Sequence, residues 1–173
     1  MITRLLLAVS TTVALGGAGD EWKTFTPKAG GFTVSFPGEP TEHKQSVKTP
    51  SGSTIEVRLY VYEAKKGEGQ YVASFSEYPE SMLKAGTDEK RLENARDGAI
   101  QNVKGTLKGG TKHIKLDGFP GLDLTIETKE KILVRTRIYA VKNRLCQTLV
   151  IGPPKMVAAK ETEQFLNSFK LVK

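Results

Sequence analysis

Alternation of apolar and polar residues is the clearest feature of the first half of the chain. Residues 32–36 alternate between apolar and polar side chains, and the segment is bounded by a Gly-Gly pair before it and a Pro-Gly pair after it. This is the pattern of a half-buried strand. Residues 54–62 alternate in the same way, so their apolar side chains are expected to face the core: Ile55, Val57, Leu59 and Val61. The other face of this segment, which carries two tyrosines, is expected to point away from the core. Residues 22–25 and 71–78 predict two further strands with a less regular pattern.

The spacing of apolar residues then changes to three or four, which predicts an amphipathic helix. The positions that set this spacing are Leu92, Ala95, Ala99 and Val103. Thr87 or Asp88 supplies a polar residue to cap the start of the helix, and Gly105 follows its end. Gly98 lies inside this helix and costs about 1 kcal/mol relative to alanine, which does not outweigh the spacing.

A second series of strands is predicted in the last third of the chain, over residues 108–116, 122–128, 132–141 and 145–151. Short polar segments separate these strands at the places where turns are needed. Pro153-Pro154 then opens a terminal helix, and Phe169 either belongs to this helix or starts a last short strand. Strands, a helix, more strands and a terminal helix predict an α+β fold, with helices packed on an antiparallel sheet.

Two arginines and a tyrosine share one face of the third strand in this series. Arg135, Arg137 and Tyr139 alternate with apolar residues and are expected to form an exposed face. A hairpin with the preceding strand would place Asp123 opposite Arg137 and Glu127 diagonal to Arg135. Such cross-strand pairs contribute about 0.2–1 kcal/mol each, so Arg135→Ala is expected to cost no more than about 1 kcal/mol. These pairs explain the arginines structurally; the alternative is that Arg135, Arg137 and Tyr139 contact a binding partner.

Residues 1–18 have the three parts of a bacterial signal peptide. Arg4 gives a positive start, an apolar run follows, and small residues precede a cleavage point between Ala18 and Gly19. A transmembrane anchor is the alternative, but a membrane-spanning helix needs about 20 apolar residues. We therefore expect an exported protein, periplasmic or secreted, in which residues 19–173 form a single domain without a membrane span.

The charge of the chain is positive but spread along its length. The formal net charge is +7 at pH 7, and acidic residues are interspersed among the lysines. A positive balance is compatible with an anionic partner, such as a protein or a component of the cell envelope. Because the sequence contains no block of five or six basic residues, we expect no nucleic-acid binding, and a solvated basic surface is the simpler interpretation.

Residues with catalytic chemistry are few and are not grouped in the sequence. The serines lack a GxSxG motif, and His43 and His113 lie in polar stretches away from any nucleophile. These two histidines and Cys146 do not have the spacing of metal ligands, and no phosphate-binding loop is present, so no cofactor is expected. The sequence therefore favours a non-enzymatic binding or assembly domain. The alternative is a hydrolytic enzyme whose carboxylates converge only in the folded chain.

Several local motifs together resemble those of exported domains with the fold of PsbP, an extrinsic subunit of the photosynthetic oxygen-evolving complex. The motifs are residues 31–40 (GFTVSFPGEP), 119–123 (FPGLD), 137–145 with the segment RIYAV, and 165–169 (FLNSF). This resemblance implies an α/β/α sandwich, and it implies binding or assembly rather than catalysis. It assigns no ligand and no site residue, because the shared motifs are strand starts, turns and a helix that packs on the sheet.

Overall fold

The computed structural model describes residues 22–48, 54–84 and 86–172. Within these residues, the chain forms one large and one small antiparallel sheet. The large sheet has the order β3-β4-β5-β9-β8-β7-β6, with strands β3 (Thr41–Lys48), β4 (Thr54–Glu63), β5 (Gln70–Glu77), β6 (Thr106–Leu116), β7 (Phe119–Glu127), β8 (Leu133–Val141) and β9 (Arg144–Gly152). The small sheet has the order β1-β2-β10, with strands β1 (Lys23–Phe25), β2 (Phe32–Phe36) and β10 (Lys170–Leu171).

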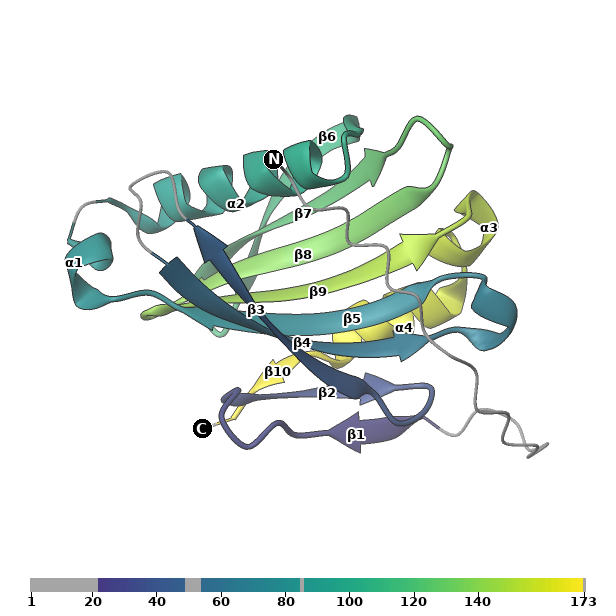
Figure 1. Ribbon diagram of the computed structural model, residues 1–173, viewed down its shortest axis with the longest axis horizontal. Helices are drawn as coiled ribbons and strands as arrows, with labels where there is room; N and C mark the ends of the chain where they lie inside the picture. Colours follow the sequence, from purple (N-terminus) through teal and green to yellow (C-terminus); the bar gives the residue numbers. More distant parts are fainter. Residues whose placement is uncertain (1–21, 49–53, 85, 173) are drawn as a thin grey trace.

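Helices cover both faces of the large sheet, as Figure 1 shows. The long helix packs on β7 and β8, while the small sheet and the C-terminal helices pack on the other face. The helical segments are η1 (Lys65–Gly67), α1 (Glu80–Leu83), α2 (Asp88–Asn102), α3 (Pro154–Val157) and α4 (Lys160–Ser168). This arrangement confirms the predicted α+β class and the α/β/α sandwich.

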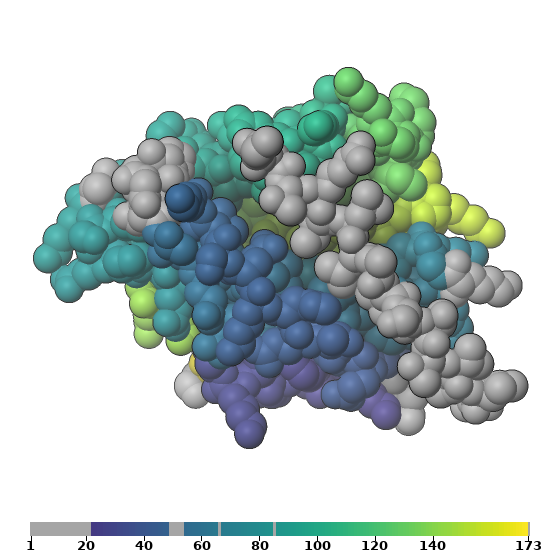
Figure 2. Space-filling model, in the orientation of Figure 1, coloured from purple at the N-terminus to yellow at the C-terminus, as the bar shows by residue number. Residues whose placement is uncertain are grey.

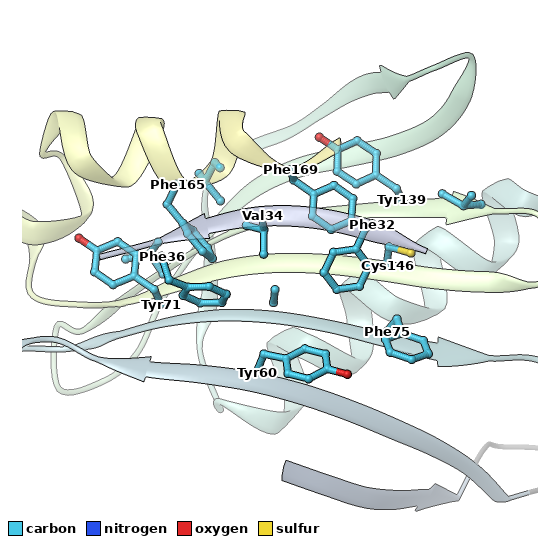
Figure 3. Packing of buried hydrophobic residues seen from close by; sticks show 14 of the residues in the cluster. Phe32, Val34, Phe36, Tyr60, Tyr71, Phe75, Tyr139, Cys146, Phe165 and Phe169 are labelled. Atoms are coloured by element: carbon cyan, nitrogen blue, oxygen red, sulfur yellow. The ribbon is translucent and has the colours of Figure 1, made fainter. Parts of the chain in front are cut away.

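The two faces of the large sheet bury two separate apolar clusters. Under α2, the cluster consists of Leu92, Leu122, Leu124, Ile126, Val134, Ile138 and Ala140. On the opposite face, the cluster is rich in aromatic rings, as Figure 3 shows: Phe36, Tyr71 and Phe165 meet on one side of Val34, and Phe32 meets Phe169 on the other. Because both faces are covered, the sheet has a core on each side, which is typical of a sandwich.

The predicted strands and the long helix are all present, with ends shifted by a few residues. Thr87 caps α2 by accepting a hydrogen bond at its hydroxyl from the Lys90 amide, 3.2 Å away. Asp117 and Gly118 both have positive φ in the two-residue turn that joins β6 to β7, which is the backbone of a type I′ hairpin turn. The terminal helix is divided into α3 and α4, and Phe169 lies between α4 and β10.

The structure corrects the predictions for the first half of the chain in two places. Strand β3 was not predicted, because its sequence is polar except for Val47 and it lies at the edge of the sheet, exposed along most of its length. Figure 2 shows it at the surface. In β4, the expected outward face carries Tyr60, which is 3% exposed. Both faces of β4 are partly covered: Ile55 is 5% exposed on one face, and Tyr60 packs on Phe25 and Phe32 on the other. Alternation alone therefore did not identify the face that packs on the aromatic cluster.

Candidate functional site

The arginines singled out in the sequence lie between the sheet and α4. Arg135 donates to Asp123 through Nε and Nη2 at 2.8 and 3.0 Å, and Arg137 donates to Asp123 through Nε at 3.0 Å. Glu163 of α4 accepts from both arginines at 3.1 Å. Asn167 also accepts from Arg137, at 2.7 Å. We call Asp123, Arg135, Arg137 and Glu163 the arginine clamp, because they hold α4 against β7 and β8.

The expectation that this strand face is exposed is wrong. The side chains of Arg135 and Arg137 are only 23% and 16% exposed, and Tyr139 is 5% exposed. The Tyr139 ring is stacked on Phe169, with 5.9 Å between the ring centroids and 5° between their planes. The role of these three residues as partner contacts stays a prediction, and the structure leaves little of their surface for a partner.

The arginine clamp sets the electrostatics of the Asp123 carboxylate. Burial raises the pKa of this carboxyl group, but hydrogen bonds from Arg135 and Arg137 outweigh burial and leave its pKa below the ordinary value. Burial also raises the pKa of the Tyr139 phenol. Asp123 faces Arg137 in the strand register, as predicted. Asp123 is therefore a stable carboxylate with cationic partners, which suits a structural ion pair better than an acid catalyst.

Glu127 differs from its predicted role in the hairpin. It pairs with Lys108 and Lys131, at 2.8 Å each, rather than with Arg135. Hydrogen bonds from these two lysines lower the pKa of Glu127 to about 2. The Glu127 pairs are solvated, whereas the arginine clamp is mostly buried.

The other candidate residues lie apart from one another. His113 is exposed on β6, and His43 is half-buried on β3 at the opposite edge of the large sheet. Cys146 is 1% exposed, and burial raises the pKa of its thiol to about 11, so the thiol is in the unreactive protonated form at neutral pH. In the part of the chain that the structure describes, no group of three or more His, Cys, Asp or Glu residues is placed to hold a metal ion. The predicted cleavage point between Ala18 and Gly19 lies outside the described residues.

A groove of about 750 Å³ opens at the end of the large sheet where β4 turns into β5. Its aromatic residues are Trp22, Tyr62 and Tyr71, and four charged residues also line it: Lys65, Glu68, Lys155 and Glu161. We call it the Trp22 groove. Its volume lies within the range of about 300–1,000 Å³ typical of small-ligand sites. The β4–β5 connection and α3 lie at the same end of the sheet in Figure 1.

Strand register brings the aromatic residues of the Trp22 groove together. Tyr62 of β4 is paired with Tyr71 of β5, so both rings lie on the same face, with centroids 6.3 Å apart. Trp22, directly before β1, meets Tyr71 edge-on at 5.9 Å and 82°. Tyr71 also packs edge-on against Phe165 of α4 at 5.3 Å. Tyr71 therefore joins Trp22 and Tyr62 to the aromatic cluster of the core.

Helix α3 lines the Trp22 groove through Lys155 and Met156, and two glycines let it approach the sheet. A Cβ atom added at Gly69 or at Gly152 would collide with the Met156 sulfur. The Met156 carbonyl accepts a hydrogen bond from the Thr162 hydroxyl at 2.8 Å, which ties α3 to the first turn of α4. Lys155 and Glu161 therefore extend from two helices that are held in a fixed relation to each other.

Sequence reasoning missed the Trp22 groove because its residues come from four separate stretches of the chain: Trp22, Pro37, residues 62–71 and residues 153–161. The signals in the sequence were the two tyrosines on the expected outer face of residues 54–62 and a tryptophan in a polar segment. Neither signal indicates a site until the strand register is known.

The fold is that of PsbP-like domains. The structure is similar to the solution structure of cyanobacterial PsbP (CyanoP) from Synechocystis sp. PCC 6803, with a TM-score of 0.59 and 10% sequence identity, over 92% of this chain and 98% of that chain. A protein of unknown function from Pseudomonas aeruginosa is a more distant match, with a TM-score of 0.44 and 11% identity over 72% of this chain and 96% of that chain. No family model and no curated protein matches the sequence. At this identity the likeness shows the fold alone.

Proposed function

We propose that the protein is an exported binding domain of the bacterial cell envelope and that it holds its ligand in the Trp22 groove without chemical turnover. The observation that carries this proposal is the groove itself, in which three aromatic rings from three segments meet four charged side chains. A concave site with aromatic residues and a few polar groups is the usual form of a ligand site. The net charge of +7 favours association with an anionic envelope surface.

Export is supported by the three-part pattern of residues 1–18. Among the helices of the described residues, none is long and apolar enough to cross a bilayer. Expression of the full chain in a bacterium, followed by intact-mass analysis of the exported product, tests this part. We expect a mature protein that begins at Gly19. A product that keeps residues 1–18 and stays embedded in the membrane contradicts it.

Binding is favoured over turnover because the two acids of the groove lie in the same site as two lysines. The groove contains two carboxylates, Glu68 and Glu161, and also two amines, Lys65 and Lys155. Hydrolysis of a glycosidic bond uses two carboxyl groups, one of which is held protonated or poised as a nucleophile. An equal number of amines and carboxylates in one groove suits polar recognition better than such a pair of catalytic acids.

Sedimentation with isolated bacterial envelopes tests the site. We expect the wild-type protein to sediment with the envelopes and the Trp22→Ala and Tyr62→Ala variants to remain mostly in solution. Tyr78→Ala is the matched control, because Tyr78 follows the opposite end of β5 and packs on Arg91 instead. Equal sedimentation of all four proteins, each with the circular dichroism spectrum of a folded domain, contradicts binding in the Trp22 groove.

A hydrolytic enzyme is the second candidate, because Glu68 and Glu161 come from distant segments and line the same groove. Release of reducing ends from envelope polysaccharide measures this activity. Turnover by the wild type that is lost in Glu68→Gln or Glu161→Gln, but kept in Glu80→Gln, establishes the enzyme and refutes binding without turnover. Glu80 is a suitable control because its side chain is 81% exposed, on α1.

A further inference from the structure

We propose that the ligand of the Trp22 groove is an oligosaccharide segment of an envelope polysaccharide, bound through neutral pyranose rings. This inference rests on the proposed function and names the chemical class of its ligand. It follows from two properties of the groove: the arrangement of its aromatic rings and the hydrogen-bonding capacity of its charged residues. We call these charged residues the rim: Lys65, Glu68, Lys155 and Glu161.

The aromatic residues form a corner. Trp22 and Tyr71 meet at 82°, and Tyr62 continues the surface at 45° to Tyr71. The face of an aromatic ring is negative, and the axial C–H groups of a pyranose ring are weakly positive, so the two attract each other when the sugar lies flat on the aromatic ring. Tyr71 is only 6% exposed, so the partly exposed rings of Trp22 and Tyr62, which both pack against Tyr71, provide these surfaces for a chain of sugars.

Counted over the residues that the structure describes, the rim has no net charge, because Lys65 and Lys155 balance Glu68 and Glu161. A polyanion or a polycation would meet as many repulsive as attractive groups there. A neutral ligand avoids this conflict and still offers polar atoms to Glu68, Lys155 and Glu161. Within the described part of the chain, Glu68, Glu161 and Lys155 form no ion pair with another residue, so their charged ends are available to a ligand.

Hydrogen-bond chemistry separates a sugar from the other neutral ligand that favours aromatic grooves, a proline-rich peptide. Ionised Glu68 and Glu161 only accept hydrogen bonds, and Lys155 only donates them. Proline has no backbone N–H, so a proline-rich segment offers carbonyl acceptors to the lysine but few donors to the glutamates. Sugar hydroxyl groups both donate and accept, and therefore complement Glu68, Glu161 and Lys155 together.

Fluorescence titration of the full-length exported protein tests this ligand class, because Trp22 is the single tryptophan of the chain and lies in the groove. The probes are the β-1,4-linked tetramers of N-acetylglucosamine and of glucose, with calorimetry as a second measurement that does not depend on emission. We expect saturable binding of at least one tetramer. Glu68→Gln and Glu161→Gln should each weaken it about tenfold, as expected for a hydrogen bond to a charged group, and Glu80→Gln should leave it unchanged.

Three results overturn the inference: no binding of either tetramer in both measurements, tetramer binding that is unaffected by both glutamate variants, or saturable binding of a proline-rich decapeptide in place of the sugars. The envelope sedimentation assay then shows which proposal has failed. If sedimentation still depends on Trp22, the groove is the binding site and only the ligand class is wrong. If it does not depend on Trp22, the proposed function fails as well.

Discussion

Replacing Asp123 by asparagine is expected to weaken the fold by removing the shared anion of the arginine clamp. Asp123 accepts three hydrogen bonds from Arg135 and Arg137, and its side chain is 11% exposed. Asparagine has nearly the same shape, but its amide group is neutral and presents one oxygen as an acceptor. The two guanidinium groups would then share Glu163 as their remaining anionic partner, and one strong donor would lose its acceptor.

The size of this effect follows from the burial of the partners. Removing one member of a fully buried ion pair costs about 3–5 kcal/mol, and an exposed pair contributes about 0–1 kcal/mol. The side chains of Arg137 and Arg135 are 16% and 23% exposed, so we expect a loss of about 2–3 kcal/mol in the free energy of unfolding. Asp97→Asn is the matched control: Asp97 also pairs with an arginine, Arg96, but the two side chains are 55% and 30% exposed, and the loss should stay below about 1 kcal/mol.

The pH dependence of Asp123→Asn gives an independent check. The pKa of Asp123 is lower in the folded state than its ordinary value. Its contribution is therefore fully present above the unfolded pKa of about 3.9, and it is lost as the pH falls through the folded pKa. Urea unfolding, followed by circular dichroism, should show a wild-type advantage at pH 7 that shrinks below pH 4. Two results would refute a stabilising role of the arginine clamp. One is a loss of unfolding free energy in Asp123→Asn no larger than that in Asp97→Asn, and the other is a difference between wild type and Asp123→Asn that does not change with pH.

Three further predictions concern the core, the thiol and the helix cap. Val134→Asp should prevent folding, because it places an unpaired charge under α2 where Val134 is 5% exposed; a cooperative urea transition in this variant would contradict the strand register. Cys146 should resist a thiol reagent at pH 8 in the folded protein and react once urea unfolds it, because its pKa is raised to about 11; fast labelling of the folded protein would show that the thiol is accessible. Thr87→Ala should lower the stability measured by urea unfolding by about 1 kcal/mol, because it removes the hydrogen bond to the Lys90 amide, whereas Thr87→Ser should keep most of it.

The sequence predicted the parts of the fold that depend on local periodicity. The strict alternation of residues 32–36 identified β2, and the three-to-four spacing after Thr87 identified α2 with its cap. The polar strand β3 has no such pattern, since an edge strand exposed along its length needs no apolar face. The face of β4 that carries Tyr60 was expected to be exposed, but Tyr60 is buried there, because tyrosine is compatible with both a core and a surface position.

The candidate site was less accessible to sequence reasoning than the fold. The pairing of Asp123 with Arg137 was predicted because it depends only on a hairpin register. The burial of this pair was not predicted, because the residues that cover it, Glu163 and Asn167, lie on a helix. They are 26 and 30 residues away from Arg137 in the sequence. The limit of about 1 kcal/mol for Arg135→Ala stays a prediction that assumed an exposed pair; the bidentate bond to Asp123 and the 23% exposure of the Arg135 side chain favour a larger loss. The Trp22 groove depends on still more distant segments, which only the folded chain brings together.

Mapping of backbone and side-chain NMR shifts on binding tests the central claim most directly. The exported protein, labelled with ¹⁵N, is titrated with the N-acetylglucosamine tetramer and with envelope polysaccharide released as soluble fragments. We predict that the shifts concentrate at the single indole N–H of Trp22 and at the amides of Tyr62, Glu68 and Ala159, all of which line the groove. Shifts that instead concentrate on Arg135, Arg137 and Tyr139, with the Trp22 indole N–H unchanged, would contradict binding in the Trp22 groove. They would indicate that the ligand binds at the arginine clamp.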